Sequence, residues 1–242
     1  METTHGAIQV FYINRDCDLE RRAHIEKQLD RLGLLSTRIR GVDGRAVPEW
    51  LNGYYDDRLT PGEVGCSASH LTACAAIRDS NLPYAVILED DAELTDDFEQ
   101  TVLDAVRIAP RSWDVIRLTR PGKNALQIIA KTSTNHSLIR YSKIPVSAAG
   151  LMVSYAGAKK LLRPRLIKEP IDSEIRYPWQ LDLNVLGIAP GVVAGIAPSI
   201  IRSTIEVRSK SRSSNKIIIG INRVAYNVRT IGILSYLMMF MG

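Results

Sequence analysis

Short apolar or extended runs alternate along the chain with segments in which apolar residues recur at helical spacing. The runs predict strands, and they occupy residues 8–13, 37–42, 85–88, 113–118 and 148–154. The helical segments occupy residues 19–32, 60–79, 95–108 and 157–162. Strands and helices that alternate in this way predict an α/β fold with a mainly parallel central sheet. A hairpin is expected within residues 120–146 and short extended pieces within residues 186–199.

The helix over residues 60–79 has the clearest beginning. Thr60 is a natural N-cap, Pro61 occupies the first helical position and Glu63 the third. Glu63 is therefore expected to cap this helix rather than to contact a ligand. His70 lies one position off the apolar stripe, and a lone histidine there is more often structural than catalytic.

Three consecutive carboxylates follow the apolar run at residues 85–88. Glu89, Asp90 and Asp91 come directly after its end, and ligands of open α/β sheets bind beyond the carboxyl ends of strands. Adjacent acids repel one another, and their burial without compensation is costly. A divalent cation resolves this, because hard oxygen ligands suit Mg²⁺ or Mn²⁺, and such ions also hold substrate phosphates. The alternative is a solvated turn that opens the next helix.

Charge is distributed unevenly over the 242 residues, a length that suits one domain with a long tail or at most two small domains. Beyond Val207 there are six basic residues and no acids, so residues 1–207 hold 25 of the 31 basic residues and all 26 acidic ones, a net of −1. A neutral body argues against nucleic-acid binding, and a cationic tail indicates an anionic surface. We therefore expect a domain over residues 1–207 and a tail over residues 208–242.

The tail combines a basic linker with two apolar blocks. Residues 208–216 are polar and basic, and residues 217–226 and 231–241 are apolar. The last block is shorter than the roughly 20 residues that cross a bilayer. A basic segment beside apolar blocks predicts a helix that lies in the interface of an anionic membrane. The alternative is that the blocks pack on the body or form an oligomer contact.

The cysteines indicate a reducing compartment. Cys17, Cys66 and Cys74 are an odd number without metal-ligand spacing. Cys66 and Cys74 lie eight residues apart on one face of a predicted helix, and we expect them to be small buried apolar residues. The first six residues have neither a basic region nor an apolar core, so no secretory signal is predicted.

Several motifs, taken in order, resemble glycosyltransferase family 25, the lipopolysaccharide and lipooligosaccharide biosynthesis transferases. The most distinctive are Leu-Thr-Pro-Gly-Glu-Val-Gly-Cys at residues 59–66 and Leu-Glu-Asp-Asp-Ala-Glu at residues 88–93. The other matching stretches are residues 10–16 with Arg21 and Arg22, residues 42–44, Ser69 with His70, and residues 113–118, 157–162 and 170–172. Each motif is weak alone, but the ordered set is specific and covers about residues 8–205.

The resemblance implies a GT-A-like nucleotide-sugar-binding fold with UDP-galactose or a related UDP-hexose as donor. The implied product is a β-linked sugar on a lipid-linked lipooligosaccharide acceptor, formed with inversion at the cytoplasmic face of the inner membrane. The three acids stand where such folds carry an Asp-x-Asp element that binds Mn²⁺ or Mg²⁺. In that frame Asp91 binds the metal directly, Glu89 contacts the ribose or a metal-bound water, and Asp90 completes the metal cluster.

The resemblance also suggests the remaining roles. Inversion needs a carboxylate on the acceptor side, opposite the leaving diphosphate, and Asp172, in a predicted loop, is expected as the general base. Glu174 is the second choice. The residues expected to contact the nucleotide lie at strand ends, and they are Asn14, Arg15, Asp43 and Glu89. From the residues alone, Asp43 fits a turn as well as a nucleotide contact.

Two other functions compete with transfer. A nucleotidyltransferase that makes an NDP-sugar would need a glycine-rich basic loop near the N-terminus, which the sequence lacks. A non-catalytic, membrane-associated cation-binding protein would place oxygen ligands at alternate positions, and the three acids do not follow that spacing. A Walker B interpretation of the acidic strand fails because no Gly-x-x-x-x-Gly-Lys-Ser/Thr loop is present.

Overall fold

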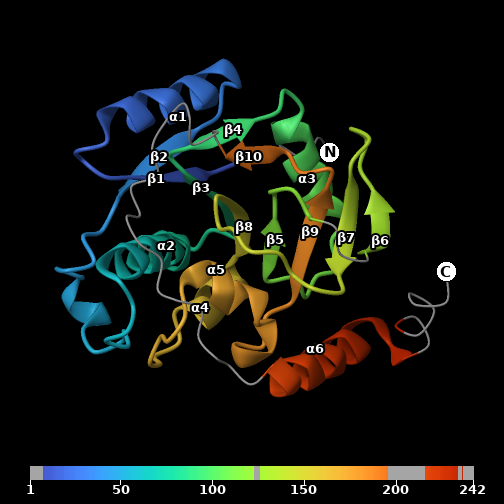
Figure 1. Cartoon of the computed structure of the whole chain (residues 1–242). Coiled ribbons are helices and arrows are strands. Elements are labelled where there is room, and N and C mark those ends of the chain that lie inside the picture. The colour runs from blue at the N-terminus through green and yellow to red at the C-terminus, as the bar shows by residue number, and fades with distance from the viewer. Residues whose placement is uncertain (1–7, 123–125, 196–215, 234–235, 237–242) are drawn as a thin grey trace.

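A central sheet of eight strands organises the computed structural model, which describes residues 8–122, 126–195, 216–233 and 236. The strand order is β2-β1-β3-β8-β5-β9-β7-β6 (Figure 1). In that order the strands are β2 (Ser36–Arg40), β1 (Val10–Asn14), β3 (Tyr84–Glu89), β8 (Gly150–Ser154), β5 (Val115–Arg117), β9 (Val185–Ala189), β7 (Ser137–Tyr141) and β6 (Leu126–Lys131). The runs expected to form strands therefore all lie in this sheet.

The sheet is mixed, so the prediction of a mainly parallel sheet is wrong. Three neighbouring pairs are parallel, β1 with β2, β1 with β3 and β5 with β9. The other four pairs are antiparallel, because β8 and β7 run against the other strands. Antiparallel neighbours need no helical crossover, and the β6–β7 hairpin, which was predicted, supplies one of them. The carboxyl ends of β1, β3, β5 and β9 still share one edge.

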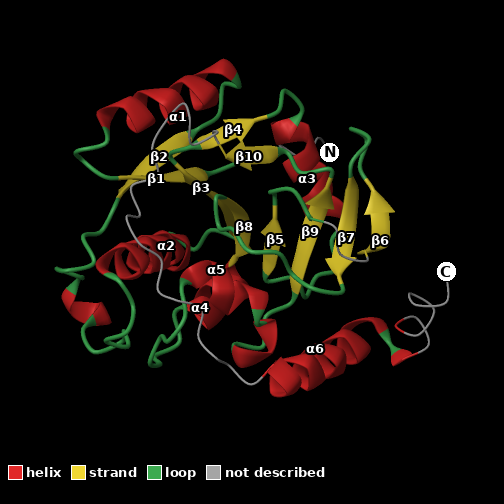
Figure 2. Cartoon of the chain, viewed as in Figure 1, coloured by secondary structure: helices red, strands yellow, loops and turns green. Residues whose placement is uncertain are grey.

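Helices cover both faces of the sheet. Two of them, α1 (Leu19–Arg31) and α3 (Phe98–Ile108), pack on one face, and α2 (Pro61–Asp79), α4 (Tyr155–Leu161) and α5 (Ile171–Arg176) pack on the other. Figure 1 shows α1 and α2 on opposite sides of β1 and β3, and Figure 2 shows the same helix–sheet–helix layering. The six inner strands of the sheet therefore have one set of side chains in each of two hydrophobic cores, whereas the edge strands β2 and β6 each contribute to one core.

The predicted start of α2 is confirmed. The Thr60 side chain accepts from the Glu63 backbone N–H, and the Glu63 carboxylate accepts from the Thr60 N–H at 2.9 Å. The loop before α2 lies against the helix backbone, since a Cβ on Gly44 would lie 1.9 Å from the Pro61 carbonyl oxygen. Close packing of this glycine fixes the position of Asp43 beside the first turn of α2.

Two local predictions differ from the structure. The segment after Pro170, expected to be a loop, forms the short helix α5, so Asp172 lies in a helical first turn. Helix α3 begins at Phe98, and its N-cap Asp97 makes no side-chain capping bond, because that carboxylate faces His136 at 2.9 Å. A second, two-stranded sheet pairs β4 (Ala92–Leu94), directly after the acids, with β10 (Val193–Gly195).

The tail contributes one helix, α6 (Lys216–Ile231), to the described part of the chain. It packs against the 3₁₀ turn η2 (Pro178–Gln180), and a second 3₁₀ turn, η1 (Glu49–Leu51), precedes α2. The boundary at residue 207 and most of the block over residues 231–241 lie outside the described residues. So does the predicted linker over residues 208–216, except for Lys216, which begins α6. None of the helices that the structure describes has the length and hydropathy to span a membrane.

Candidate functional site at the carboxyl end of β3

The alternation of β3 sends its first two acids to opposite faces of the sheet. Ala85 and Ile87 belong to the core under α2, and Val86 and Leu88 belong to the core under α1. Glu89 continues the first set, and its carboxylate lies beside two side chains of α2. Asp90 meets α1 instead. Because consecutive side chains of a strand point to opposite faces, Glu89 and Asp90 lie on opposite sides of the sheet.

Arg21 neutralises the acids on the α1 side. Its Nε donates to Asp90 Oδ1 at 2.6 Å, and its Nη2 lies 2.5 Å from Asp90 Oδ1 and 3.0 Å from Asp91 Oδ2. Asn14 Nδ2 donates to the other oxygen of Asp90 at 2.8 Å. Arg21 and Asp90 are both buried. An arginine, rather than a cation from solution, thus compensates much of the charge for which the sequence predicted a metal.

Sequence reasoning assigned no role to Arg21, although a signal was present. Arg21, Ile25 and Leu29 recur every four residues and are the three buried positions of α1. An arginine in the inward stripe of an amphipathic helix needs a buried carboxylate nearby, because an unpaired buried charge is costly. Asp90 is that carboxylate.

Asp91 retains one oxygen that no group among the described residues satisfies. Its Oδ2 lies near Arg21, whereas Oδ1 is buried and has no hydrogen-bond partner. Buried polar atoms without partners are rare in folded proteins. A carboxylate oxygen in this state fits a hard divalent cation as its missing partner.

Glu89 lies in a different environment. The pKa of its carboxyl is raised from 4.5 to about 8, chiefly by burial and then by the charges of Asp91 and Asp90, against the lowering effect of Arg21. Its Oε1 lies 3.9 Å from Cys66 Sγ and 3.8 Å from His70 Nε2. Glu89 is therefore protonated at pH 7, and a bound cation has to displace that proton.

The two candidate bases differ in how they are held. Asp172 is half-buried, and its charge contributes to the raised pKa of Glu89, so α5 places the two carboxyls in one electrostatic neighbourhood. Glu174 is buried and accepts two hydrogen bonds from Arg165, at 3.0 and 2.6 Å. This bidentate ion pair occupies both Glu174 oxygens.

Arg117 is a second buried cation that sequence reasoning missed. It ends β5 on the same face as Glu89, with 1% of its surface exposed, and it donates to the backbone oxygens of Pro145 and Ser147. Burial lowers the pKa of this guanidinium, and Asp172 opposes that effect. Its Nε and the Tyr141 hydroxyl are both buried, and neither has a hydrogen-bond partner in the part of the chain that the structure describes. The signal was a charged residue inside a run expected to be buried on both faces.

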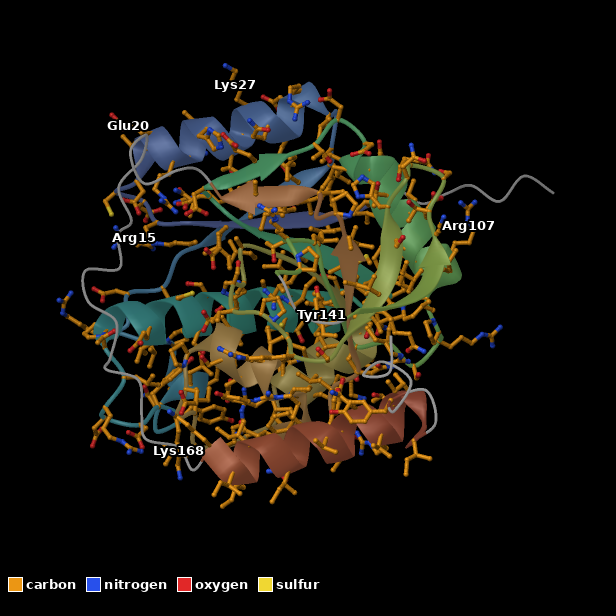
Figure 3. The ribbon with its side chains drawn as sticks, turned by 45° about the vertical axis from the view of Figure 1, so that its right-hand side comes forward. Arg15, Glu20, Lys27, Arg107, Tyr141 and Lys168 are labelled. Atoms are coloured by element: carbon orange, nitrogen blue, oxygen red, sulfur yellow. The ribbon has the colours of Figure 1, made fainter. Side chains whose placement is uncertain are left out.

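The structure holds the predicted nucleotide contacts in three different states. Asn14 is buried, and its amide is used by Asp90 and by the Asp18 carbonyl. Arg15 is exposed on the rim between α1 and α2 (Figure 3), where it pairs with Asp18 at 2.6 Å. Asp43 is exposed in its turn and accepts from the Arg45 N–H at 2.9 Å. The structure thus joins Asn14 to the acids and leaves Arg15 and Asp43 open to solvent.

A family model for glycosyltransferase family 25 (LPS biosynthesis protein) matches residues 7–173. The chain is 26% identical over 217 residues to the inactive glycosyltransferase 25 family member 3 of Mus musculus, covering 76% of this chain and 36% of that protein. It is 27% identical over 185 residues to procollagen galactosyltransferase 1 of Danio rerio, covering 69% of this chain and 30% of that protein. The chain therefore spans about a third of the length of these relatives.

One solved structure in the comparison is a glycosyltransferase involved in the glycosylation of the major capsid of PBCV-1. It covers 80% of this chain and 96% of its own, with a TM-score of 0.38 and 8% sequence identity.

The Arg21 network predicts a large loss of stability from one substitution. Arg21→Met keeps most of the apolar stem but leaves Asp90 buried without its cation, and we expect a loss of about 3–5 kcal/mol in the free energy of unfolding. The matched control is the half-exposed neighbour Arg22→Met, which loses only a surface ion pair with Glu26 and should change little. Urea titration measures both. Adding Asp90→Asn to Arg21→Met should recover part of the loss, and an unchanged double variant would contradict the pairing.

The raised pKa of Glu89 predicts a pH dependence of stability. Because the folded state binds this proton more tightly than the unfolded state, the stabilisation is complete below pH 4.5 and is lost as pH rises through about 8. Glu89→Gln should remove this component. Between pH 4.5 and about 8 the melting temperature of the variant should therefore rise relative to that of the wild type. Melts with a chelator present measure the difference. Glu93→Gln, an exposed acid of β4, is the control and should follow the wild type.

Proposed function

The chain belongs to glycosyltransferase family 25, and from this premise we propose that it transfers a hexose, with galactose as the proposed sugar, from a UDP-sugar to a lipid-linked lipopolysaccharide or lipooligosaccharide acceptor. The proposed reaction inverts the anomeric centre and is assisted by Mn²⁺ or Mg²⁺. A GT-A-like mode of donor binding, beyond the carboxyl ends of β1 and β3, is part of this proposal.

The observation that carries the proposal is the convergence of Glu89, Asp91 and Asp172. Glu89 is the last residue of β3, Asp91 follows it by two residues, and Asp172 lies in the first turn of α5, 81 residues after Asp91 in the sequence. Asp172 is near enough to influence the pKa of Glu89. A transferase of this kind needs one carboxylate group for the diphosphate end of the donor and another for the acceptor, and this arrangement supplies both.

The donor set fits a divalent cation through Asp91 and Glu89. Asp91 Oδ1 is the buried atom without a partner, and Glu89 ionises when a cation replaces its proton. Both Asp90 oxygens are already bonded, so in this proposal Asp90 orients its neighbour. When bound, the cation would act as a Lewis acid that stabilises the negative charge developing on the UDP leaving group.

We assign the general base to Asp172. It would accept the proton of the acceptor hydroxyl as that oxygen attacks the anomeric carbon, a role that typically contributes about 10²–10⁴-fold to the rate. Glu174 is a poorer candidate, because Arg165 holds both of its oxygens. Arg15 and Asp43, which are exposed, are proposed to contact the nucleotide, and Asn14 to hold Asp90.

A nucleotidyltransferase remains the competing enzyme. It would release pyrophosphate from a nucleoside triphosphate, whereas the proposed transferase releases UDP from a UDP-hexose. Incubation with Mn²⁺, a panel of UDP-hexoses and the acceptor separates the two outcomes. Absence of UDP release with every donor would overturn the proposal.

Asp172→Asn should lower transfer by about 10²–10⁴-fold while UDP binding is retained, because the amide cannot accept the proton. UDP release and UDP titration calorimetry measure the two properties. Asp79→Asn, an exposed carboxylate at the last turn of α2, is the matched control and should transfer normally. Full activity in Asp172→Asn would move the base to another residue.

We further propose that α6 docks on the anionic inner leaflet. The helix meets the body through the buried Tyr226 ring, which lies beside Trp179, and through two hydrogen bonds. The Tyr226 hydroxyl accepts from the Val185 N–H at 3.2 Å, and Asn227 Nδ2 donates to the Ser142 carbonyl at 2.9 Å. Ile221 and Val224 point away from the body, 62% and 45% exposed. An amphipathic helix normally buries its apolar side against its own protein. This one presents an apolar outward face, which also includes Ile217 and Ile218.

Charge favours a membrane over a second copy of the chain as the occupant of the outward face. Helix α6 contains Lys216, Arg223 and Arg229 and no acid. Basic residues near an anionic leaflet contribute about 1 kcal/mol each. A two-fold dimer through the same face would bring these like charges together.

Ile221→Asn with Val224→Asn should abolish co-sedimentation of the full chain with phosphatidylglycerol vesicles, because the apolar insertion is lost. Ile128→Asn, an exposed isoleucine of β6, is the control and should sediment like the wild type. Binding of the wild type should weaken when salt is added, and also when phosphatidylcholine vesicles replace the anionic phosphatidylglycerol vesicles. Vesicle binding that survives the double substitution, or dimerisation that it abolishes, would contradict the docking.

A further inference from the structure

A second set of metal-ligating side chains meets at Glu89, on the α2 side of the sheet. Cys66, His70 and Glu89 each offer one ligand atom, and these atoms all lie within 4.8 Å of one another. Cys66 and His70 are one turn apart on α2, and Glu89 ends β3 opposite them. The three cysteines lack metal-ligand spacing among themselves, and the fold supplies it by adding a histidine and a carboxylate.

The contacts of His70 indicate which ring nitrogen carries the proton and which carries the free lone pair. Nδ1 lies 3.0 Å from the Cys66 carbonyl oxygen, and Nε2 lies 3.3 Å from the Ala148 carbonyl oxygen. The side chain is 2% exposed, and burial disfavours the doubly protonated ring, so only one nitrogen carries a proton. The shorter contact assigns that proton to Nδ1. Nε2 then directs a lone pair toward two oxygens, those of Ala148 and Glu89.

A cation that displaces the Glu89 proton would be held between the His70 lone pair and the ionised carboxylate. Histidines that bind zinc characteristically donate their other ring N–H to a backbone carbonyl or carboxylate, as His70 Nδ1 does toward Cys66. The Nε2 of His70 and the Oε1 of Glu89 are 3.8 Å apart, too far for a direct hydrogen bond. A metal between them would be a ligand-distance from each.

The spacing suits zinc. Tetrahedral Zn²⁺ with bonds of about 2.0–2.3 Å places nitrogen and oxygen ligands about 3.4 Å apart and sulfur and oxygen ligands about 3.6 Å apart. The corresponding separations are 3.8 Å for His70 Nε2 to Glu89 Oε1 and 3.9 Å for Cys66 Sγ to Glu89 Oε1. Cys66 Sγ lies 3.8 Å from His70 Nδ1, and the three ligand atoms lie within 4.8 Å of one another, so side-chain rotation has to bring the thiol toward Nε2 to complete the site.

We propose that Cys66, His70 and Glu89 form a Zn²⁺ site with three protein ligands, distinct from the hard-ion site at Asp91. A thiolate and an imidazole select zinc over Mg²⁺ and Mn²⁺, which prefer oxygen ligands. Three protein ligands leave the fourth position of zinc for water or another ligand.

The two sites share Glu89, and this has a consequence that rests on the proposed transferase function. Zn²⁺ that draws the Glu89 carboxylate toward α2 removes it from the donor ion at Asp91. Zinc therefore competes with Mn²⁺, and it inhibits transfer at concentrations that saturate the cysteine–histidine–glutamate site.

Cobalt substitution tests the binding directly. The full chain, kept reduced and stripped of metal, is titrated with Co²⁺, whose spectrum reports a thiolate ligand by charge-transfer absorption, and then with Zn²⁺. We expect one Co²⁺ per chain with thiolate absorption and its displacement by Zn²⁺. Wild-type protein that binds Co²⁺ without thiolate absorption, or binds none, overturns the site whatever the variants do.

Variants identify the ligands. Cys66→Ser should abolish the thiolate absorption and weaken Zn²⁺ binding by more than the roughly 100-fold that loss of an outer-shell partner costs. Cys17→Ser, an exposed cysteine, is the matched control and should retain both properties. An unchanged cobalt spectrum in Cys66→Ser overturns the proposal, with melting temperature as the check on folding.

Activity measurements separate this proposal from the proposed function. Asp91→Asn should lose Mn²⁺-supported transfer but keep the cobalt–thiolate spectrum. If no UDP-hexose is turned over while the spectrum is present, the zinc site stands and the transferase proposal falls. If transfer occurs and saturating Zn²⁺ leaves it unchanged, the competition through Glu89 is wrong.

Discussion

The buried ion pair between Arg21 and Asp90 is the constraint on which the candidate site depends. Two side chains with little contact with water meet at 2.5 Å, and Asn14 occupies the remaining aspartate oxygen. Such a pair contributes little net stability compared with apolar residues, but loss of either partner leaves an unpaired buried charge that destabilises the fold. The pair therefore acts mainly as a fixed geometry. It fastens α1 to the end of β3 and determines where Asp91 lies.

The alternation of side chains along β3 places Asp90 and Glu89 in different environments. The α1 side holds a compensated and fully bonded carboxylate, whereas the α2 side holds Glu89, whose proton is retained to about pH 8. Two adjacent residues with the same acidic chemistry thus acquire opposite roles because they face different helices. Environment, rather than residue type, sets which of them is available to a cation.

The sequence predicted well what local physics determines and poorly what distant contacts determine. The Thr60–Glu63 capping box and the apolar run of β3 are local signals, and both are confirmed. Strand direction is not local, because β8 reaches the sheet after a hairpin and pairs antiparallel with both neighbours. The partner of Asp90 was also out of reach, since 69 residues separate it from Arg21. His70 was taken as structural because a pattern along one helix cannot show that a strand ends opposite it.

Glu89 also links the two proposed cation sites. The neutral Glu89 carboxyl stabilises the ligand-free protein at pH 7, because an ionised Glu89 would repel the negative charge of Asp91. The same proton is the first thing any cation must remove, so binding at either site is coupled to proton release. A single carboxyl cannot serve a hard ion on the α1 side and a soft ion on the α2 side with equal strength. Its orientation therefore sets the balance between the two, and α2, through His70 and Cys66, is positioned to bias that orientation.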